Sequence, residues 1–228
     1  MRRRPIARSV IAAAVAACAL LIAPVHVAPA QADPCPDVDV VFARGTNEPP
    51  PLGPVGDVFV AALRPLVGDK SVGVYGVNYP ANMDFNLAID GIRDAAAHVS
   101  DMAKTCPKTK MVLSGFSQGA AVMGFVTADA VPDGVPQDVL AQGLPKPLPS
   151  EVADHVAAVV LFGTPSDRFM DSIGMPPIVI GPRYKAKTLE LCADGDVICS
   201  DQGDFGAHGL YTVNGLPNQG AQYAASKL

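Results

Sequence analysis

The sequence predicts an α/β domain in which helices cover both faces of a five-stranded parallel sheet. Segments rich in β-formers alternate with segments of helical pattern, which is the order typical of parallel sheets. Residues 156–162 form a continuous apolar run, as expected for a strand buried on both faces. Residues 88–106 place apolar or small side chains at alternating steps of four and three residues, which form one helix face.

The elements follow one another in a simple order along the chain. We expect the strand order 2-1-3-4-5, which is common in such sheets, and one domain without internal repeats or a lid domain. The expected strands are 37–43, 72–77, 111–113, 156–162 and 187–191. The expected helices are 58–67, 88–106, 118–130 and 218–226.

The first 32 residues have the pattern of a secretory signal peptide. Four arginines precede an apolar run from Val10 to Val27, and residues 30–32 (Ala-Gln-Ala) match a cleavage site. A membrane anchor is the alternative, but Pro24 and His26 interrupt the run. We therefore expect residues 1–32 to be removed and the protein to be secreted, either free or associated with the cell envelope.

The mature segment, residues 33–228, is acidic. Four of the 17 basic residues and none of the 22 acidic ones lie before it, which leaves 13 basic residues and a net charge of −9. This charge argues against nucleic-acid binding and against attraction to anionic lipid. No further segment is apolar enough to span a bilayer. We expect the mature protein to be a monomer of one domain.

Four cysteines remain after cleavage, and an even number in an exported chain indicates two disulfides. Cys35 precedes the first expected strand and Cys106 precedes the third. These strands are neighbours in the order 2-1-3-4-5, so Cys35 and Cys106 can meet at the amino edge of the sheet. That pairing leaves Cys192 with Cys199. None of the four has the spacing of a zinc site.

A candidate nucleophile stands between the third strand and the helix that follows it. Residues 115–119 read Gly-Phe-Ser-Gln-Gly, the G-x-S-x-G pattern. A serine exposed at the top of a sheet sits on a sharp, strained strand-to-helix bend, and glycines two residues away on each side relieve the crowding. The pattern alone is weak evidence, but its strand–turn–helix context favours Ser117 as a nucleophile.

A serine hydroxyl needs a base, usually a histidine held by a carboxylate. Sites in parallel sheets form at the carboxyl ends of the strands. His208 follows the fifth strand and meets this condition, whereas His155 precedes the fourth strand and His98 lies on a helix. Between Ser117 and His208 several acids qualify from spacing, and two of them, Asp194 and Asp196, lie within the segment from Cys192 to Cys199. We favour Asp196 and keep Asp194 open as its rival.

An oxyanion hole needs two N–H donors. The amide of Gln118 lies beside the serine at a helix N-terminus, and Thr46 follows the first strand at the same edge. Arg44 is more typical of a residue that braces loops than of a catalytic one. This chemistry requires no metal or organic cofactor.

Two further segments bear on the substrate. The Pro- and Gly-rich residues 131–151 precede the fourth strand, so we expect a surface loop at the amino edge of the sheet and not a lid. Residues 169–180 are more apolar than a solvated loop requires and are candidates to line an acyl-chain groove. Packing of this segment on the sheet edge is the alternative.

Five segments together resemble the cutinase family, especially the cutinase-like secreted esterases of mycobacteria and related actinobacteria. They are 41–46 (Val-Phe-Ala-Arg-Gly-Thr), 75–81 (Tyr-Gly-Val-Asn-Tyr-Pro-Ala), 115–119, 192–199 (Cys-Ala-Asp-Gly-Asp-Val-Ile-Cys) and 207–208 (Ala-His). The C-x-x-G-D-x-[IV]-C element is far more specific than G-x-S-x-G. Thr46, where fungal members more often carry Ser, and the long 131–151 insert depart from the fungal pattern.

The resemblance implies an α/β-hydrolase-type three-layer sandwich. It implies Ser117, Asp196 and His208 as the catalytic triad, and Gln118 with Thr46 as the oxyanion pair. It also implies the disulfides Cys35–Cys106 and Cys192–Cys199. Asp196 is thereby preferred over Asp194.

The expected function is a secreted serine carboxylester hydrolase. We expect cleavage of short- to medium-chain esters, of the cutin-polyester or lipid type, without interfacial activation. A phospholipase or thioesterase acting on envelope lipids is the alternative within enzymes. A non-catalytic lipid-binding surface protein is the alternative of another class, and the intact triad argues against it.

Overall fold

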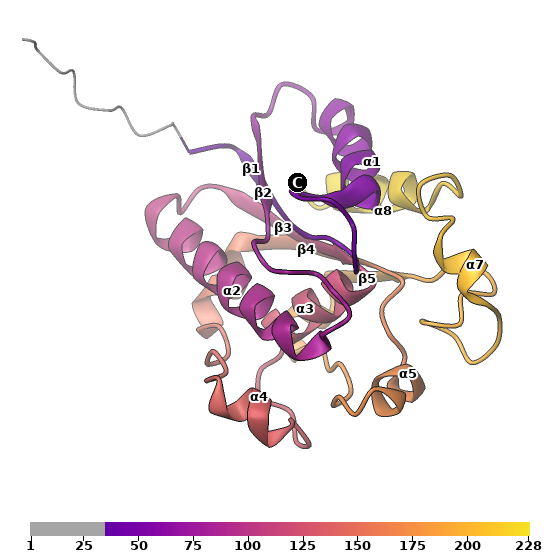
Figure 1. The fold of residues 1–228 in the computed structure, drawn as a ribbon. Coiled ribbons are helices and arrows are strands. Elements are labelled where there is room, and N and C mark those ends of the chain that lie inside the picture. The colour runs from indigo at the N-terminus through magenta and orange to yellow at the C-terminus, as the bar shows by residue number, and fades with distance from the viewer. Residues whose placement is uncertain (1–34) are drawn as a thin grey trace, which may run out of the picture. The chain divides into compact units, whose positions relative to one another are not determined.

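The computed structural model describes residues 35–228, and the expected signal peptide lies outside the described residues. All five strands form one parallel sheet in the order β2-β1-β3-β4-β5, as the sequence predicted (Figure 1). The strands are β1 (Val38–Ala43), β2 (Val72–Gly76), β3 (Lys110–Phe116), β4 (Val156–Phe162) and β5 (Thr188–Leu191).

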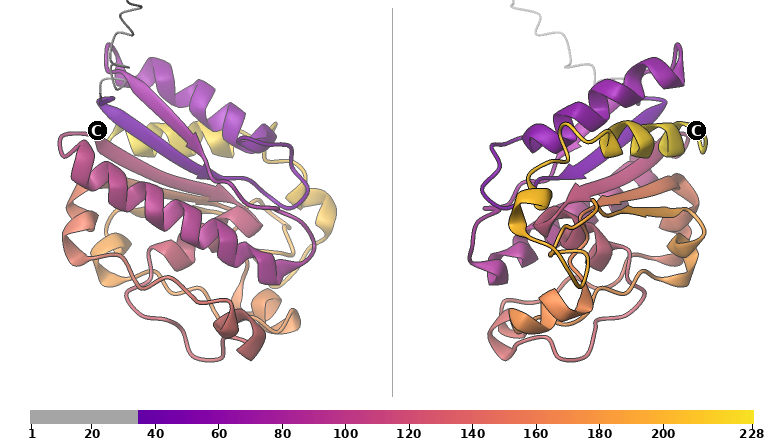
Figure 2. Two further views of the ribbon diagram at one scale, coloured as in Figure 1. Left: turned by 60° about the vertical axis from the view of Figure 1, so that its left-hand side comes forward. Right: turned by 90° about the vertical axis from the view of Figure 1, so that its right-hand side faces the viewer.

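Two pairs of helices enclose the sheet in three layers (Figure 2). Helices α1 (Gly53–Leu63) and α8 (Leu216–Ala225) cover one face, and α2 (Ala88–Thr105) and α3 (Gln118–Val126) cover the other. The short helices are α4 (Gln137–Ala141), α5 (Asp167–Ser172), α6 (Pro182–Lys185) and α7 (Phe205–His208). Three 3₁₀ turns span Arg64–Val67, Phe85–Leu87 and Ser150–His155.

The alternation of side chains along the strands divides the core into two layers. In β1, Val40 and Phe42 pack with the residues of α1, whereas Val41 and Ala43 pack with those of α2 and α3. All four are fully buried. A strand buried on both faces must be apolar at successive positions, which explains the continuous runs in the sequence. Among the helices of residues 35–228, none combines the length and hydropathy needed to cross a bilayer.

Several helix boundaries differ from those expected. Helix α1 begins at Gly53 and not at residue 58. Pro54 is favoured at the start of the helix, because the first N–H groups of a helix have no partner within it and the missing N–H of proline costs nothing there. Helix α3 ends at Val126 and not at residue 130. There the hydroxyl of Thr127 donates to the carbonyls of Met123 and Gly124.

The expectation that the whole 131–151 insert lies at the amino edge of the sheet is wrong. Its last residues do lead into β4 at that edge, but its central part runs beside α2. Asn86, just before α2, donates to Asp138 over 3.3 Å between Nδ2 and Oδ2. Arg93 of α2 donates to the carbonyl of Gly143 at 3.0 Å and 2.8 Å from Nε and Nη2.

The reason for this position is the apolar side chains within the insert. Val139 is buried, and Val135, Leu144 and Leu148 are half-buried against the helical layer of α2 and α3. A solvated loop at the amino edge would leave these side chains in water, which costs more than laying the loop over a helix face. Because α2 begins at the carboxyl edge of the sheet, the insert reaches toward the site described below.

Both disulfides join the cysteines that strand order had paired. Cys35 is bonded to Cys106 and Cys192 to Cys199, with Cα–Cα distances of 5.5 Å and 5.8 Å. The first bond closes a long loop at the amino edge of the sheet, with a sequence separation of 71 residues. The second spans 7 residues after β5, at the opposite edge.

Replacing Cys35 and Cys106 together by alanine is expected to lower stability and leave catalysis intact. Opening a loop of this length costs about 4 kcal/mol in the chain-entropy account, equivalent to a melting temperature roughly 10 °C lower. Differential scanning calorimetry and ester hydrolysis at 25 °C check both parts. An unchanged melting temperature, or a loss of activity while the variant is folded, would contradict this expectation.

Candidate active site

The serine of the G-x-S-x-G motif stands on a strained turn between β3 and α3. Ser117 has φ 55° and ψ −118°, a region that residues with a side chain rarely occupy. A β carbon on Gly115 would overlap the carbonyl of Gly119, and one on Gly119 would overlap the carbonyl of Ala43 in β1. The two glycines are therefore required by close backbone contacts on either side of the serine.

Three of the expected side chains form a hydrogen-bonded relay. His208 Nε2 lies 2.8 Å from Ser117 Oγ, and His208 Nδ1 lies 2.7 Å from Asp196 Oδ2. With Nδ1–H donating to the carboxylate, Nε2 is free to accept the serine proton. The Phe116 ring stacks on the imidazole at a centroid distance of 4.8 Å, which limits rotation of the ring.

Asp196 is completely buried, so its charge depends on local hydrogen bonds. Its Oδ1 accepts from the amide of Ile198 at 2.9 Å, and its Oδ2 accepts from the Tyr211 hydroxyl at 2.8 Å as well as from His208. Burial raises the pKa of Asp196, but the hydrogen bonds from His208, Ile198 and Tyr211 outweigh burial and hold the pKa below its ordinary value. The carboxylate is therefore ionised throughout the neutral range.

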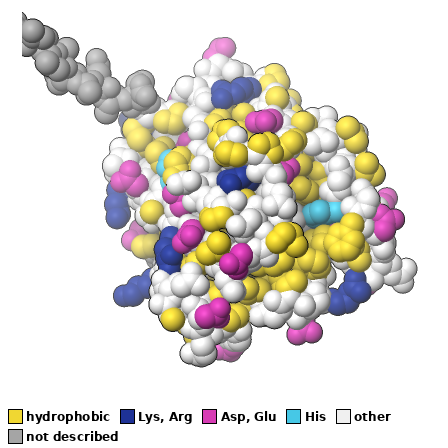
Figure 3. All heavy atoms as spheres, in the orientation of Figure 1, with side chains coloured by type: hydrophobic (Ala, Val, Ile, Leu, Met, Phe, Trp, Pro, Cys, Tyr) yellow, Lys and Arg dark blue, Asp and Glu magenta, His cyan; other side chains and the backbone are white. Residues whose placement is uncertain are grey.

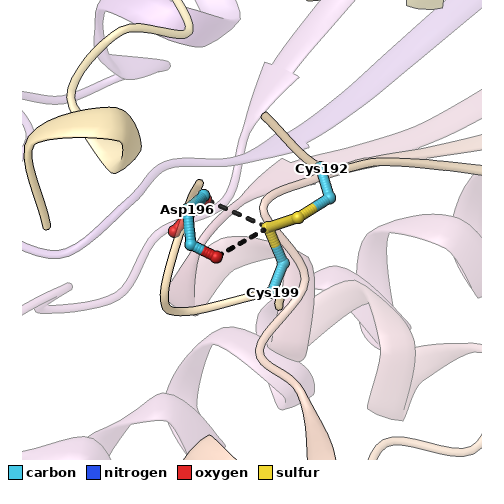
Figure 4. Close-up of side chains that lie close together, drawn as sticks. All are labelled: Cys192, Asp196 and Cys199. Carbon is cyan, nitrogen blue, oxygen red and sulfur yellow. Dashed lines mark hydrogen bonds between the residues drawn. A yellow bond between two sulfur atoms is a disulfide. The ribbon is translucent and has the colours of Figure 1, made fainter. Parts of the chain in front are cut away.

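The Cys192–Cys199 disulfide fixes the loop that carries this carboxylate (Figure 4). Cys199 Sγ lies 3.0 Å from Asp196 Oδ2. Two sulfurs and a carboxylate this close resemble a metal-ligand set, but the sulfurs are bonded to each other, so neither is a thiolate ligand. Asp194, the rival acid, is exposed on the same loop.

His208 is positioned by a capped helix of one turn. Asp204 is the N-cap of α7, and its Oδ1 accepts from the amides of Gly206 and Ala207 at 2.7 Å and 3.2 Å. The Asp204 amide donates to the carbonyl of Gly195 at 2.9 Å. The loop that carries the acid and the helix that carries the base are thus joined directly.

The two candidate oxyanion donors also lie together. Thr46 Oγ1 is 3.5 Å from Gln118 Oε1, and Gln118 Nε2 donates to the carbonyl of Asn82 at 3.1 Å. The amide of Gln118 is at the N-terminus of α3, where the helix dipole favours negative charge. The loop that carries Thr46 is held by Glu48, whose Oε2 accepts from the amide of Gly45 at 2.7 Å.

Arg44 braces this region through carbonyl groups. It donates to the carbonyls of Glu48 at 2.9 Å, Val77 at 3.3 Å and Tyr79 at 2.6 Å. In return, the Tyr79 hydroxyl donates to the carbonyl of Arg44. The expected bracing role of Arg44 is thus borne out, although its partners are main-chain carbonyls and not carboxylates.

An apolar cleft leads to Ser117. Its walls contain the aromatic residues Phe85, Phe125, Phe169 and Phe205 together with several aliphatic side chains. Figure 3 shows hydrophobic side chains gathered beside a histidine on this face. Within the candidate groove segment 169–180, the cleft is lined by Phe169, Met170, Ile173 and Met175, whereas Ile180 is buried in the core.

A family model described as Cutinase matches residues 34–228. The chain belongs to the cutinase family. Its similarity to a probable carboxylesterase of Mycobacterium tuberculosis, Culp5, is 58% identity over 170 residues, which covers 75% of this chain and 95% of that protein. Phospholipase Culp4 of the same organism is 48% identical over 220 residues, which covers 96% of this chain and 91% of the relative.

Solved structures agree with this assignment. The Trichoderma reesei cutinase in complex with a phosphonate inhibitor is 31% identical, with a TM-score of 0.62, and the match covers 85% of this chain and 77% of that one. An acetylxylan esterase at 22% identity, with a TM-score of 0.69, shows the same fold over 85% of this chain and 99% of that one. This cutinase-family protein is a serine carboxylic ester hydrolase.

Sequence reasoning missed two residues that support the site, Tyr211 and Glu48. Tyr211 is fully buried; its hydroxyl donates to Asp196 and accepts from the amide of Ala193 at 2.9 Å. Burial raises the pKa of Glu48, although the Gly45 amide counteracts it. A tyrosine three residues after the histidine, and an acid two residues after the threonine, were the available signals.

Replacing Tyr211 by phenylalanine is expected to lower kcat and stability. Loss of the hydroxyl leaves the Asp196 carboxylate with one donor fewer and the Ala193 amide unpaired, at a cost of about 1–3 kcal/mol. Tyr223→Phe on α8 is the matched control, because Tyr223 lies away from the site. Equal kcat and melting temperature in the two variants would refute the positioning role of Tyr211.

The depressed pKa of Asp196 predicts how stability depends on pH. Its contribution is fully present above the ordinary carboxyl pKa of 3.8 and is lost as the pH falls through the lower pKa of the folded state. Asn at position 196 does not titrate. The difference in melting temperature between wild type and Asp196→Asn should therefore be smaller below about pH 4 than it is at about pH 5. A gap that widens as the pH falls below about 5 would contradict the assignment.

Proposed function

We propose that this enzyme is a secreted esterase that cleaves short- to medium-chain carboxylic esters through an acyl-enzyme on Ser117. The observation that carries the proposal is the relay from Ser117 through His208 to the buried Asp196, with distances of 2.8 Å and 2.7 Å. No metal or organic cofactor takes part in the proposed reaction.

In the proposed reaction, His208 Nε2 takes the hydroxyl proton as Ser117 Oγ attacks the ester carbonyl. The resulting oxyanion is held by the amide of Gln118 and by Thr46. When the C–O bond breaks, the proton on Nε2 passes to the departing alcohol. A water molecule then gives its proton to His208 and attacks the acyl carbonyl, and the acid leaves as Ser117 regains its proton. Asp196 stabilises the imidazolium in both halves.

Secretion of the mature protein is part of the proposal. Residues 1–32 have the pattern of a cleaved signal, residues 33–228 form the proposed mature single domain, and the two disulfides suit an oxidising compartment. Location outside the cell, free or at the envelope, follows as part of the proposal, and we propose a monomer.

Phospholipase activity is a second candidate, because the relative Culp4, at 48% identity, is named a phospholipase. The cleft is lined mainly by apolar side chains, which suit the acyl chain of a lipid ester as well as that of a simple ester. A panel of p-nitrophenyl butyrate, a triglyceride, a phosphatidylcholine and a polyester separates the two. Higher kcat/KM on the phospholipid would favour the second candidate.

Replacing Ser117 by alanine is expected to lower kcat on p-nitrophenyl butyrate by about 10⁴-fold or more, because the nucleophile is removed. The same variant should not be labelled by a fluorophosphonate probe. Ser114→Ala replaces a buried serine within β3 and tests whether labelling is specific to the serine of the turn. Equal labelling of wild type and Ser117→Ala would overturn the proposed mechanism.

A further inference from the structure

A second apolar cavity adjoins the cleft at Ser117. Its volume is about 80 Å³, which is below the range of sites for drug-sized ligands, so it suits only a narrow segment of a ligand. The cavity and the cleft share four wall residues: Phe85, Ala88, Phe125 and Met175. The two spaces are therefore adjacent through this common wall, which comes from the start of α2, the end of α3 and the segment after α5.

The roof of this cavity is the 131–151 insert. The insert contains α4, which Figure 1 shows near α2. Val135, Val139 and Leu144 face the floor that α2 and α3 provide. The insert is attached to α2 by the hydrogen bonds of Asn86 and Arg93 described above.

The composition of the roof explains why the cavity stays open. Pro132, Pro145 and Pro147 line it, and Pro176 adds to the wall. Each proline fixes its own φ and restricts the residue before it, so the roof cannot easily collapse onto α2. A preshaped cavity also loses little conformational entropy when a ligand enters.

The chemistry of the lining selects a hydrocarbon chain. Asn86 and Lys146 are the polar side chains of the cavity wall. The Asn86 amide is already bonded to Asp138, and Lys146 is exposed. The remaining wall has no polar side chain to bind a headgroup or a sugar, so an alkyl chain that enters from the cleft fits it best.

The position of His208 decides which half of an ester, the acyl or the alcohol part, points toward the cavity. The departing alcohol must receive its proton from His208 Nε2, so it lies on the His208 side of Ser117. The cavity wall contains neither His208 nor Phe205 or Ile198, which line the other side of the cleft. The acyl substituent therefore points toward the shared wall of Ala88 and Phe125.

We propose that the cavity beneath the 131–151 insert is an acyl-chain chamber that receives the distal part of the substrate's acyl chain. This inference rests on the proposed acyl-enzyme at Ser117. Chains too short to pass the shared wall gain nothing from it. Each methylene that enters raises kcat/KM by up to about fourfold.

Two variants fill the chamber from opposite sides: Ala96→Phe from the α2 floor and Val135→Trp from the roof. Position 96 is buried and position 135 half-buried, and both line the chamber and not the cleft. Leu140→Trp is the matched control, because Leu140 lies on the same insert, is 39% exposed and does not line the chamber. The substrates are p-nitrophenyl butyrate and decanoate below their aggregation concentrations.

Both filling variants should retain butyrate kcat/KM within about twofold of wild type. Their decanoate-to-butyrate ratio should fall at least about tenfold, whereas Leu140→Trp should keep the wild-type ratio. An unchanged ratio in folded filling variants would overturn the chamber and leave the esterase proposal standing. If wild type hydrolyses neither ester, the proposed function itself fails.

A measurement on unmodified protein covers the case in which the variants do not fold. Wild type is inactivated with a p-nitrophenyl phosphonate whose alkyl group on phosphorus, the mimic of the acyl chain, is either ethyl or decyl. Hydrogen exchange of the peptide 135–144 is then compared between the two adducts. Slower exchange with the decyl adduct alone supports the chamber. Equal exchange with the two adducts refutes it.

Discussion

The close contact between β1 and the turn after β3 is the constraint on which the site depends. Ser117 adopts its positive φ only because Gly115 and Gly119 let three stretches of main chain meet without β carbons. This contact fixes the serine hydroxyl, the N-terminus of α3 and the start of the Thr46 loop relative to one another. A shift of any one of them would move the proposed nucleophile away from the proposed oxyanion donors, so this backbone contact fixes the geometry of the site.

A buried carboxylate is costly unless it is fully hydrogen-bonded, and here that requirement joins several loops. Asp196 receives hydrogen bonds from His208, Ile198 and Tyr211, while the Cys192–Cys199 bond holds its loop. The energy that makes the charge tolerable therefore also orients the imidazole. Catalytic geometry and local stability have the same origin in this part of the molecule.

The sequence predicted the sheet and its strand order well, because these follow from strong local patterns. Apolar runs marked the buried strands, and sorting each loop to one sheet edge brought Ser117, Asp196 and His208 together. Tyr211 was not found, because its position three residues after His208 is a weak signal that does not reveal the hydrogen bond to Asp196. The insert was misplaced because proline and glycine content indicates a loop but does not indicate the surface on which the loop packs.

The way the insert is attached has a consequence for the diversity of this family. Arg93 binds main-chain carbonyls of Gln142 and Gly143, which every residue type provides. Apart from Asp138, which accepts from Asn86, and the apolar positions that pack on α2 and α3, the attachment therefore places little restriction on the side chains of the insert. Substitutions there can reshape the space beneath it while the reaction centre keeps its geometry, so the range of accepted substrates can diverge independently of the chemistry performed on them.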